Sequence, residues 1–119
     1  MAHRRYQRAD LERAPFVVFY EVTQACALAC THCRACAQPL RHPEELDARQ
    51  ARELLAQLAR FEPQPLVVLT GGDPLERSDL ESLVAFGTTL GLEMALTPSA
   101  TPRLTRAALQ SLGRAGLRR

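Results

Sequence analysis

Several features that mark other protein classes are missing from this chain of 119 residues. It has no apolar run near the ~20 residues that a membrane-spanning helix needs, so we expect no membrane span. The first residues are basic but lead into no apolar segment, so we expect no secretory signal and take the cytoplasm as the compartment. A formal net charge of only +2 gives no reason to expect a nucleic-acid partner. With no internal repeat or low-complexity segment, the chain is expected to form one domain with a modest core.

Much of the positive charge that is present gathers at the two ends of the chain. We interpret these arginines as solvated termini rather than as a nucleic-acid-binding patch. They suggest a basic N-terminal extension, residues 1–14, followed by a folded core, residues 15–119. The arginines concerned are Arg4, Arg5, Arg8, Arg13, Arg114, Arg118 and Arg119.

Three short apolar runs predict β-strands. Residues 16–23 and 66–70 are rich in β-branched, aromatic and aliphatic side chains, and residues 93–97 form a weaker third run. Amphipathic patterns between and after them predict helices, so the order is β-α-β-α-β-α. This order predicts an α/β fold with a parallel sheet and right-handed crossovers.

Polar residues mark where the helices are expected to begin. Asp47 with Gln50, and Ser78 with Glu81, have the spacing of capping boxes, in which each side chain bonds the other residue's backbone N–H. Thr105 is expected to cap a third helix.

The predicted fold is unfinished in two respects. Crossovers of one hand cover only one face of the sheet, although the first two strands are apolar on both faces. The chain also stops in residues 117–119, where a fourth strand is expected to begin. A truncated reading frame or an excised piece explains this better than a complete small protein.

All four cysteines fall within residues 26–36, a crowding that favours metal or redox chemistry over a disulfide framework. Cys26, Cys30 and Cys33 have the spacing C-x3-C-x2-C. Three thiolates on one loop can hold three irons of a cubane cluster and leave the fourth iron open to a ligand. Two alternatives remain. The three residues would share one face of a helix, where cysteine serves as a small apolar residue. With Cys36, four ligands could close a ferredoxin-like cluster or a zinc site that has no catalytic role.

The other chemically distinctive residues also follow strands. Gly71, Gly72 and Asp73 follow the second strand; paired glycines let a ligand approach the backbone, and a carboxylate can accept hydrogen bonds from an ammonium group. Thr97 ends the third strand and Ser99 follows it, at positions where hydroxyls either cap turns or bind a sugar. In a parallel sheet these loops share the carboxyl edge with the cysteines. The Gly-Gly-Asp segment taken alone is also compatible with an ordinary turn.

On these motifs the sequence resembles the radical S-adenosylmethionine (SAM) superfamily. The cysteine spacing is that superfamily's signature, and Gly71-Gly72-Asp73-Pro74 matches its glycine-rich motif, with Asp where relatives often have Glu. The branch that it resembles contains haem-biosynthesis and peptide-modifying members, many with a C-terminal auxiliary-cluster (SPASM-type) domain. The segments that carry this closer likeness are residues 21–26, 33–35, 69–74 and 96–102.

The resemblance implies a partial (β/α)6 TIM-like barrel, of which residues 15–119 would supply three units. It implies that Cys26, Cys30 and Cys33 bind a [4Fe–4S] cluster. Gly71, Gly72 and Asp73 would contact the methionyl amino group of SAM, and Thr97 and Ser99 would meet its carboxylate or ribose. His32 stands where relatives have an aromatic residue or His that packs near the adenine. From the residues alone we favour a packing or backbone role for His32 over metal ligation.

The function implied is that of a radical SAM enzyme. One electron from a reduced flavodoxin or ferredoxin would cleave SAM to methionine and a 5′-deoxyadenosyl radical, which would abstract hydrogen from a tetrapyrrole (haem precursor) or peptide. Two departures from the family stand out. Cys36 occupies a position where many relatives have no cysteine, and the second half of the barrel, where much of the substrate pocket belongs, is absent from the sequence.

Overall fold

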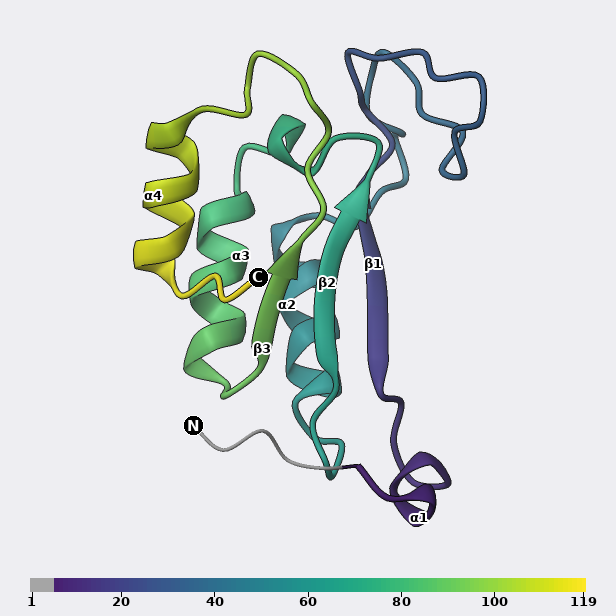
Figure 1. Cartoon of the computed structure of the whole chain (residues 1–119), viewed down its shortest axis with the longest axis vertical. Helices are drawn as coiled ribbons and strands as arrows, with labels where there is room; N and C mark the ends of the chain where they lie inside the picture. The colour runs from purple at the N-terminus through teal and green to yellow at the C-terminus, as the bar shows by residue number, and fades with distance from the viewer. Residues whose placement is uncertain (1–5) are drawn as a thin grey trace.

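A parallel three-stranded sheet forms the centre of the protein, which was analysed as a computed structural model that describes residues 6–119 (Figure 1). The strands are β1 (Val17–Thr23), β2 (Leu66–Gly71) and β3 (Glu93–Leu96), in the order β1-β2-β3. Both neighbouring pairs are parallel. The predicted α/β fold is confirmed, and each predicted strand agrees with the observed one to within one residue at either end.

Three helices pack on one side of this sheet (Figure 1): α2 (Ala48–Leu58), α3 (Leu80–Thr89) and α4 (Arg106–Ala115). Two of the predicted caps are confirmed. Asp47 and Gln50 form the capping box of α2, and the Thr105 hydroxyl accepts a hydrogen bond from the Ala108 N–H at 3.1 Å.

The predicted Ser78–Glu81 capping box is wrong. Asp79 occupies the N-cap of α3 and caps it with no side-chain hydrogen bond. Its carboxylate instead pairs with the Arg77 guanidinium, with Oδ1 2.6 Å from Nε. A 3-10 turn, η1 (Pro74–Glu76), precedes this pair and sets where α3 begins.

The hydrophobic core lies between the sheet and the helices. Alternate strand residues point into it, as the two-residue period of a strand requires, and they meet residues at helical spacing on α2 and α3. Its fully buried members include Val22, Val67, Leu69, Leu55, Leu83, Val84 and Met94.

The opposite face of the sheet is open, as predicted. Phe19 on β1 is 62% exposed, although a phenylalanine in a strand normally packs against another layer. At the other edge, the Arg118 N–H donates to the Met94 carbonyl and the Leu96 N–H donates to the Arg119 carbonyl, both at 2.9 Å. Residues 117–119 therefore lie along β3 as the expected fourth strand would begin.

The N-terminal segment packs below the sheet. Residues 1–5, which include Arg4 and Arg5, lie outside the described part of the chain. A short helix, α1 (Arg8–Leu11), leads into β1. Tyr6 donates its hydroxyl hydrogen to the Gln64 carbonyl at 2.9 Å and stacks edge-on against Phe16, with ring centroids 4.5 Å apart. No helix in the described part of the chain is long and apolar enough to cross a membrane.

Arg77 ties the layers together beneath the carboxyl edge of the sheet. Its buried guanidinium donates to the Val22 carbonyl at 2.8 Å and to the Leu46 carbonyl at 2.7 Å, in addition to its pair with Asp79. Burial acts to lower the pKa of Arg77, but the hydrogen bond and charge of Asp79, with Glu45 nearby, leave that pKa raised. No motif in the sequence marks this residue, which fixes the end of β1 where the cysteine loop (residues 25–38) begins.

Candidate functional site

The loops that follow the three strands meet at one end of the sheet (Figure 1). Ser99, from the loop after β3, donates its hydroxyl hydrogen to the Gly72 carbonyl at 2.9 Å. The Cys26 sulfur lies 3.8 Å from the same hydroxyl oxygen. Three residues predicted to bind cofactors, from three separate motifs, are thereby in contact.

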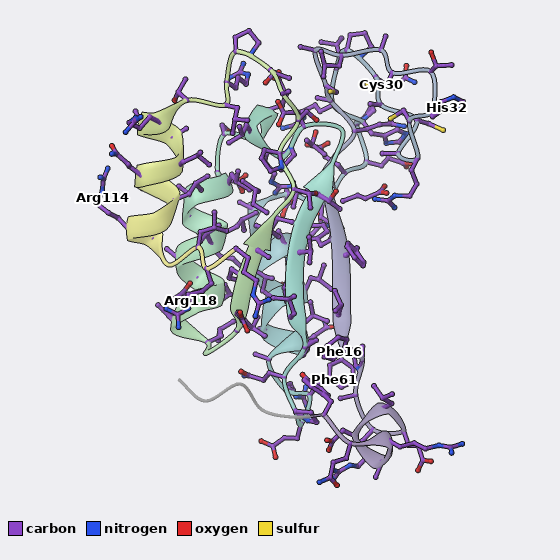
Figure 2. The ribbon with its side chains drawn as sticks, viewed as in Figure 1. Phe16, Cys30, His32, Phe61, Arg114 and Arg118 are labelled. Atoms are coloured by element: carbon purple, nitrogen blue, oxygen red, sulfur yellow. The ribbon has the colours of Figure 1, made fainter. Side chains whose placement is uncertain are left out.

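The cysteine loop is closed at its base and open at its tip. Ala25 and Gln38 form an isolated parallel bridge, and the Cys26 N–H donates to the Gln38 carbonyl at 2.8 Å. Beyond this base the chain forms turns without a helix, so the helical interpretation of the cysteines is not observed. Cys30 and His32 lie in the part that projects away from the helices (Figure 2).

The four thiols differ in exposure, and all are free. Cys26 is buried, Cys33 is half-buried, and Cys30 and Cys36 are exposed. Within residues 6–119 no three Cys, His, Asp or Glu side chains form a ready-made metal site. A metal held by these cysteines would have to draw them together, as metals commonly do when they organise their own sites.

The donor set nevertheless fits an iron–sulfur cluster. Thiolates are the ligands that such clusters prefer, and Cys26, Cys30 and Cys33 are free thiols on one loop that is pinned at its base. Two of their sulfurs are already oriented by backbone N–H groups. Leu28 N lies 3.4 Å from the Cys26 sulfur, and Ala37 N lies 3.4 Å from the Cys33 sulfur.

Gly71 and Gly72 support the cysteine loop directly. The Gly72 N–H donates to the Thr23 carbonyl at 3.0 Å, and φ of Gly71 is 142°, a value that L side chains rarely adopt. A Cβ on Gly72 would lie 2.6 Å from the Gln24 carbonyl oxygen and closer still to that of Ala25. The two glycines are therefore required so that the loop after β2 can pack on the start of the cysteine loop.

Asp73 is fully buried, which the sequence did not indicate. Its Oδ1 accepts the Leu75 N–H at 3.1 Å, as the N-cap of η1, and its Oδ2 accepts the Thr101 hydroxyl at 2.7 Å. In this arrangement both carboxylate oxygens of Asp73 are therefore bonded within the protein rather than exposed to an ammonium group. The Asp73 N–H itself donates to the Ala25 carbonyl at 2.7 Å, which adds a further link to the cysteine loop.

Thr101 is the functional-site residue that sequence reasoning missed. It is buried, and it holds the Asp73 carboxylate from 28 positions away. The one feature of the sequence that could have indicated Thr101 is its position in the loop after the third strand, which also contains Ser99.

Replacing Thr101 with valine is expected to lower the free energy of unfolding by about 1–3 kcal/mol, because the buried Asp73 carboxylate loses a donor. Thr97→Val is the matched control: Thr97 is exposed, so we expect a change within about 0.5 kcal/mol. Urea unfolding followed by circular dichroism measures both. Equal effects of the two substitutions would contradict the assigned role of Thr101.

The two other predicted site residues, Thr97 and His32, are both exposed. Thr97 is exposed, and its N–H continues the sheet by donating to the Leu69 carbonyl at 3.0 Å. His32 is exposed at the cysteine loop, so the favoured packing role is not seen within the described chain. Arg34, the residue after Cys33, forms an exposed ion pair with Glu21 at 3.2 Å.

An open pocket of about 380 Å³ lies at the base of the cysteine loop. Its wall is acidic, so it favours a cationic over an anionic group. One carboxylate, that of Glu45, accepts a hydrogen bond from the Thr23 hydroxyl at 2.9 Å. The lining residues are Glu21, Thr23, Gln24, Ala35, His42, Glu44 and Glu45.

Comparison with known proteins identifies the family. The sequence model of the Radical SAM superfamily matches residues 20–119, which include all three loops of the site. The chain belongs to the radical SAM superfamily. Members of this superfamily use a [4Fe–4S] cluster and SAM, and the parallel half-sheet described above is consistent with part of their TIM-like barrel.

Curated radical SAM relatives include tetrapyrrole and peptide enzymes. An AdoMet-dependent heme synthase of Oleidesulfovibrio alaskensis is 40% identical over 85 residues, which are 71% of this chain and 22% of the relative. The PqqA peptide cyclase of Bradyrhizobium diazoefficiens is 32% identical over 117 residues, 98% of this chain and 30% of the relative. The mycofactocin maturase MftC of Mycolicibacterium smegmatis is 37% identical over 75 residues, 63% and 19% respectively. The chain thus spans less than a third of the length of these relatives.

Proposed function

We propose that this chain is the cluster- and SAM-binding part of a radical SAM enzyme. The observation that carries the proposal is the contact of Cys26, Ser99 and Gly72, which come from the loops after all three strands. In radical SAM chemistry the cluster supplies one electron, and SAM is cleaved to methionine and a 5′-deoxyadenosyl radical that abstracts hydrogen from the substrate.

Each loop has a distinct task in this proposal. Cys26, Cys30 and Cys33 hold the cluster and leave one iron for SAM. The backbone of Gly71–Asp73 receives the methionyl amino group, since the Gly72 carbonyl already faces the Ser99 hydroxyl. Ser99 and Thr97 meet the carboxylate or ribose of SAM, and His32 packs near the adenine.

The two ends of this SAM site differ in how fixed they are. Ser99 and Gly72 are held by hydrogen bonds to each other and to the base of the cysteine loop. His32, by contrast, is exposed on the projecting loop. Binding of the adenine would therefore require that loop to close over it.

The proposal extends to substrate, donor and compartment. Relatives named as a heme synthase and a PqqA peptide cyclase support a tetrapyrrole or a peptide as the hydrogen donor. A reduced flavodoxin or ferredoxin would deliver the electron, and the cytoplasm, which keeps thiols reduced, is the compartment that suits ligands of this kind. Residues 15–119 would form half of the catalytic barrel, with residues 1–14 as an extension.

One other function has a specific observation in its favour. Cys36 lies on the same loop as the three signature cysteines, so four thiolates could hold a closed iron–sulfur or zinc site with no place for SAM. The superfamily match and the contact of Gly72 with Ser99 favour the open site.

The activity can be tested by the products of SAM cleavage. Protein reconstituted with iron and sulfide under anaerobic conditions, then reduced with dithionite in the presence of SAM, is expected to release 5′-deoxyadenosine, measured by liquid chromatography and mass spectrometry. Cys30→Ala is the control, because Cys30 is exposed and its loss removes a cluster ligand with little effect on packing. Equal release by the two proteins, or none by either, would contradict the proposal.

A further inference from the structure

Cys33 and Cys36 are held in a geometry that suits a disulfide. The Cys36 N–H donates to the Cys33 carbonyl at 3.3 Å, so residues 33–36 form a hydrogen-bonded turn. The Cα atoms at the ends of such a turn lie less than about 7 Å apart, and disulfides usually join Cα atoms about 4.4–6.8 Å apart. The Cα separation that this turn allows is therefore compatible with a disulfide between the two cysteines.

The Cys33 sulfur faces the end of this turn. Ala37 N lies 3.4 Å from it, and Ala37 directly follows Cys36. Residues 31–32 also form a turn, so Cys30 and Cys33, which have the same C-x2-C spacing, lie at the ends of a similar turn. The two possible pairs differ in that the Cys33 sulfur is contacted by the N–H of Ala37, on the Cys36 side.

Cys36 is fixed in an unusual conformation. Its φ is +48°, a left-handed value that non-glycine residues rarely adopt. Its carbonyl accepts hydrogen bonds from the Gln24 side chain at 3.2 Å and from the Gln38 side chain at 3.1 Å. Because both ends of the loop hold it, the turn is maintained without a metal.

We propose that residues Cys33 and Cys36 are a site of reversible oxidation by a low-molecular-weight disulfide such as oxidised glutathione. Cys36, the more exposed thiol, attacks one sulfur of the glutathione disulfide as the thiolate, breaks the S–S bond and releases one reduced glutathione. Cys33 then attacks the Cys36 sulfur of the mixed disulfide and releases the second. Two electrons and two thiol protons pass from the protein to two molecules of reduced glutathione.

The oxidation has a consequence that rests on the proposed function. A disulfide to Cys33 removes one of the three cluster ligands, so the oxidised protein cannot take up a cluster until a reductant opens the bond. Through Cys36, the redox state of the surroundings then controls whether a cluster can be loaded. Replacement of Cys36 removes the disulfide and keeps Cys33 free to bind the cluster.

Peptide mapping tests the disulfide itself. Trypsin cleaves after Arg34, between the two cysteines, so a Cys33–Cys36 bond links peptides 14–34 and 35–41, whereas a Cys30–Cys33 bond leaves peptide 35–41 free. After treatment of the cluster-free protein with oxidised glutathione, we expect the linked pair in the wild type, in Cys26→Ser and in Cys30→Ser. We expect its loss in Cys33→Ser, with glutathione retained on Cys36. A free peptide 35–41 in the oxidised wild type, or a linked pair that survives in Cys33→Ser, would overturn the proposal.

Iron loading separates this proposal from the proposed function. Oxidised wild-type protein is expected to incorporate less than a tenth of the iron that the reduced protein takes up, while Cys36→Ser loads equally before and after oxidation. A linked peptide pair in protein that loads iron in neither state would support the disulfide and contradict the cluster function. Equal loading of oxidised and reduced wild type would overturn the regulatory consequence.

Discussion

Cys26→Ala is expected to abolish cluster binding, whereas Cys36→Ala is expected to retain it. Cys26 is the proposed ligand that contacts Ser99, on one of the proposed SAM-binding loops, and two thiolates cannot hold a cubane cluster in place of three. After anaerobic reconstitution, Cys26→Ala should contain less than a tenth of the iron and sulfide of the wild type. Cys36→Ala should contain the same amount as the wild type.

This pair of variants also decides between the open and the closed site. A four-thiolate cluster or zinc site needs both cysteines, so equal loss of metal in the two variants would favour the non-catalytic alternative. Thermal unfolding of the metal-free proteins is the control, because Cys26 is buried and its truncation could act through folding. We expect a melting temperature close to that of the wild type for Cys36→Ala, which is exposed.

Gly72→Ala is expected to have a large effect for the addition of a single methyl group. The new Cβ would lie 2.6 Å from the Gln24 carbonyl oxygen and 2.8 Å from the Ala25 carbonyl carbon, and backbone atoms cannot rotate away. The loop after β2 must separate from the cysteine loop, which breaks the bond from the Gly72 N–H to Thr23. We expect a loss of about 1–3 kcal/mol in the free energy of unfolding and no SAM binding by the reconstituted protein.

Gly113→Ala is the matched control for this substitution. Gly113 lies within α4, and nothing stands within 4 Å of its added Cβ. Because alanine is the better helix former, this variant is expected to gain up to about 1 kcal/mol in stability and to bind SAM as the wild type does. Urea unfolding gives the stabilities, and equilibrium dialysis with labelled SAM gives the binding. Comparable behaviour of the two variants would contradict the supporting role of the Gly-Gly turn.

The sheet was predictable because its signals are local and agree with one another. Residues 66–70 are apolar and rich in β-branched side chains, which predicts a strand. Asp47 has Gln50 at capping-box spacing, which predicts the start of a helix, so a few neighbouring residues are enough to identify each element. The Ser78–Glu81 prediction was wrong because it left out the contacts of Arg77. The buried Arg77 guanidinium binds the Asp79 carboxylate and two distant backbone carbonyl groups, and α3 begins after Asp79.

The location of the site could be predicted, but its internal geometry could not. Parallel strands bring their following loops to one edge, which is why the meeting of Cys26, Gly72 and Ser99 follows from element order alone. Nothing in the sequence shows that Asp73 is fully buried, or that Thr101 rather than a ligand meets its carboxylate. Such pairs depend on how two loops pack against each other, and contacts between loops, unlike those of helices and strands, leave no periodic pattern in the sequence.

Electron paramagnetic resonance of the reduced, reconstituted protein shows whether SAM binds at an open iron of the cluster. We expect a [4Fe–4S]⁺ signal whose g-values move when SAM is added, because SAM would occupy the iron that Cys26, Cys30 and Cys33 leave open. The Cys36→Ala protein is expected to respond to SAM in the same way. A cluster signal in both proteins that SAM does not change, or the absence of any cluster signal, would contradict the assignment of this chain as the SAM-binding part of a radical enzyme.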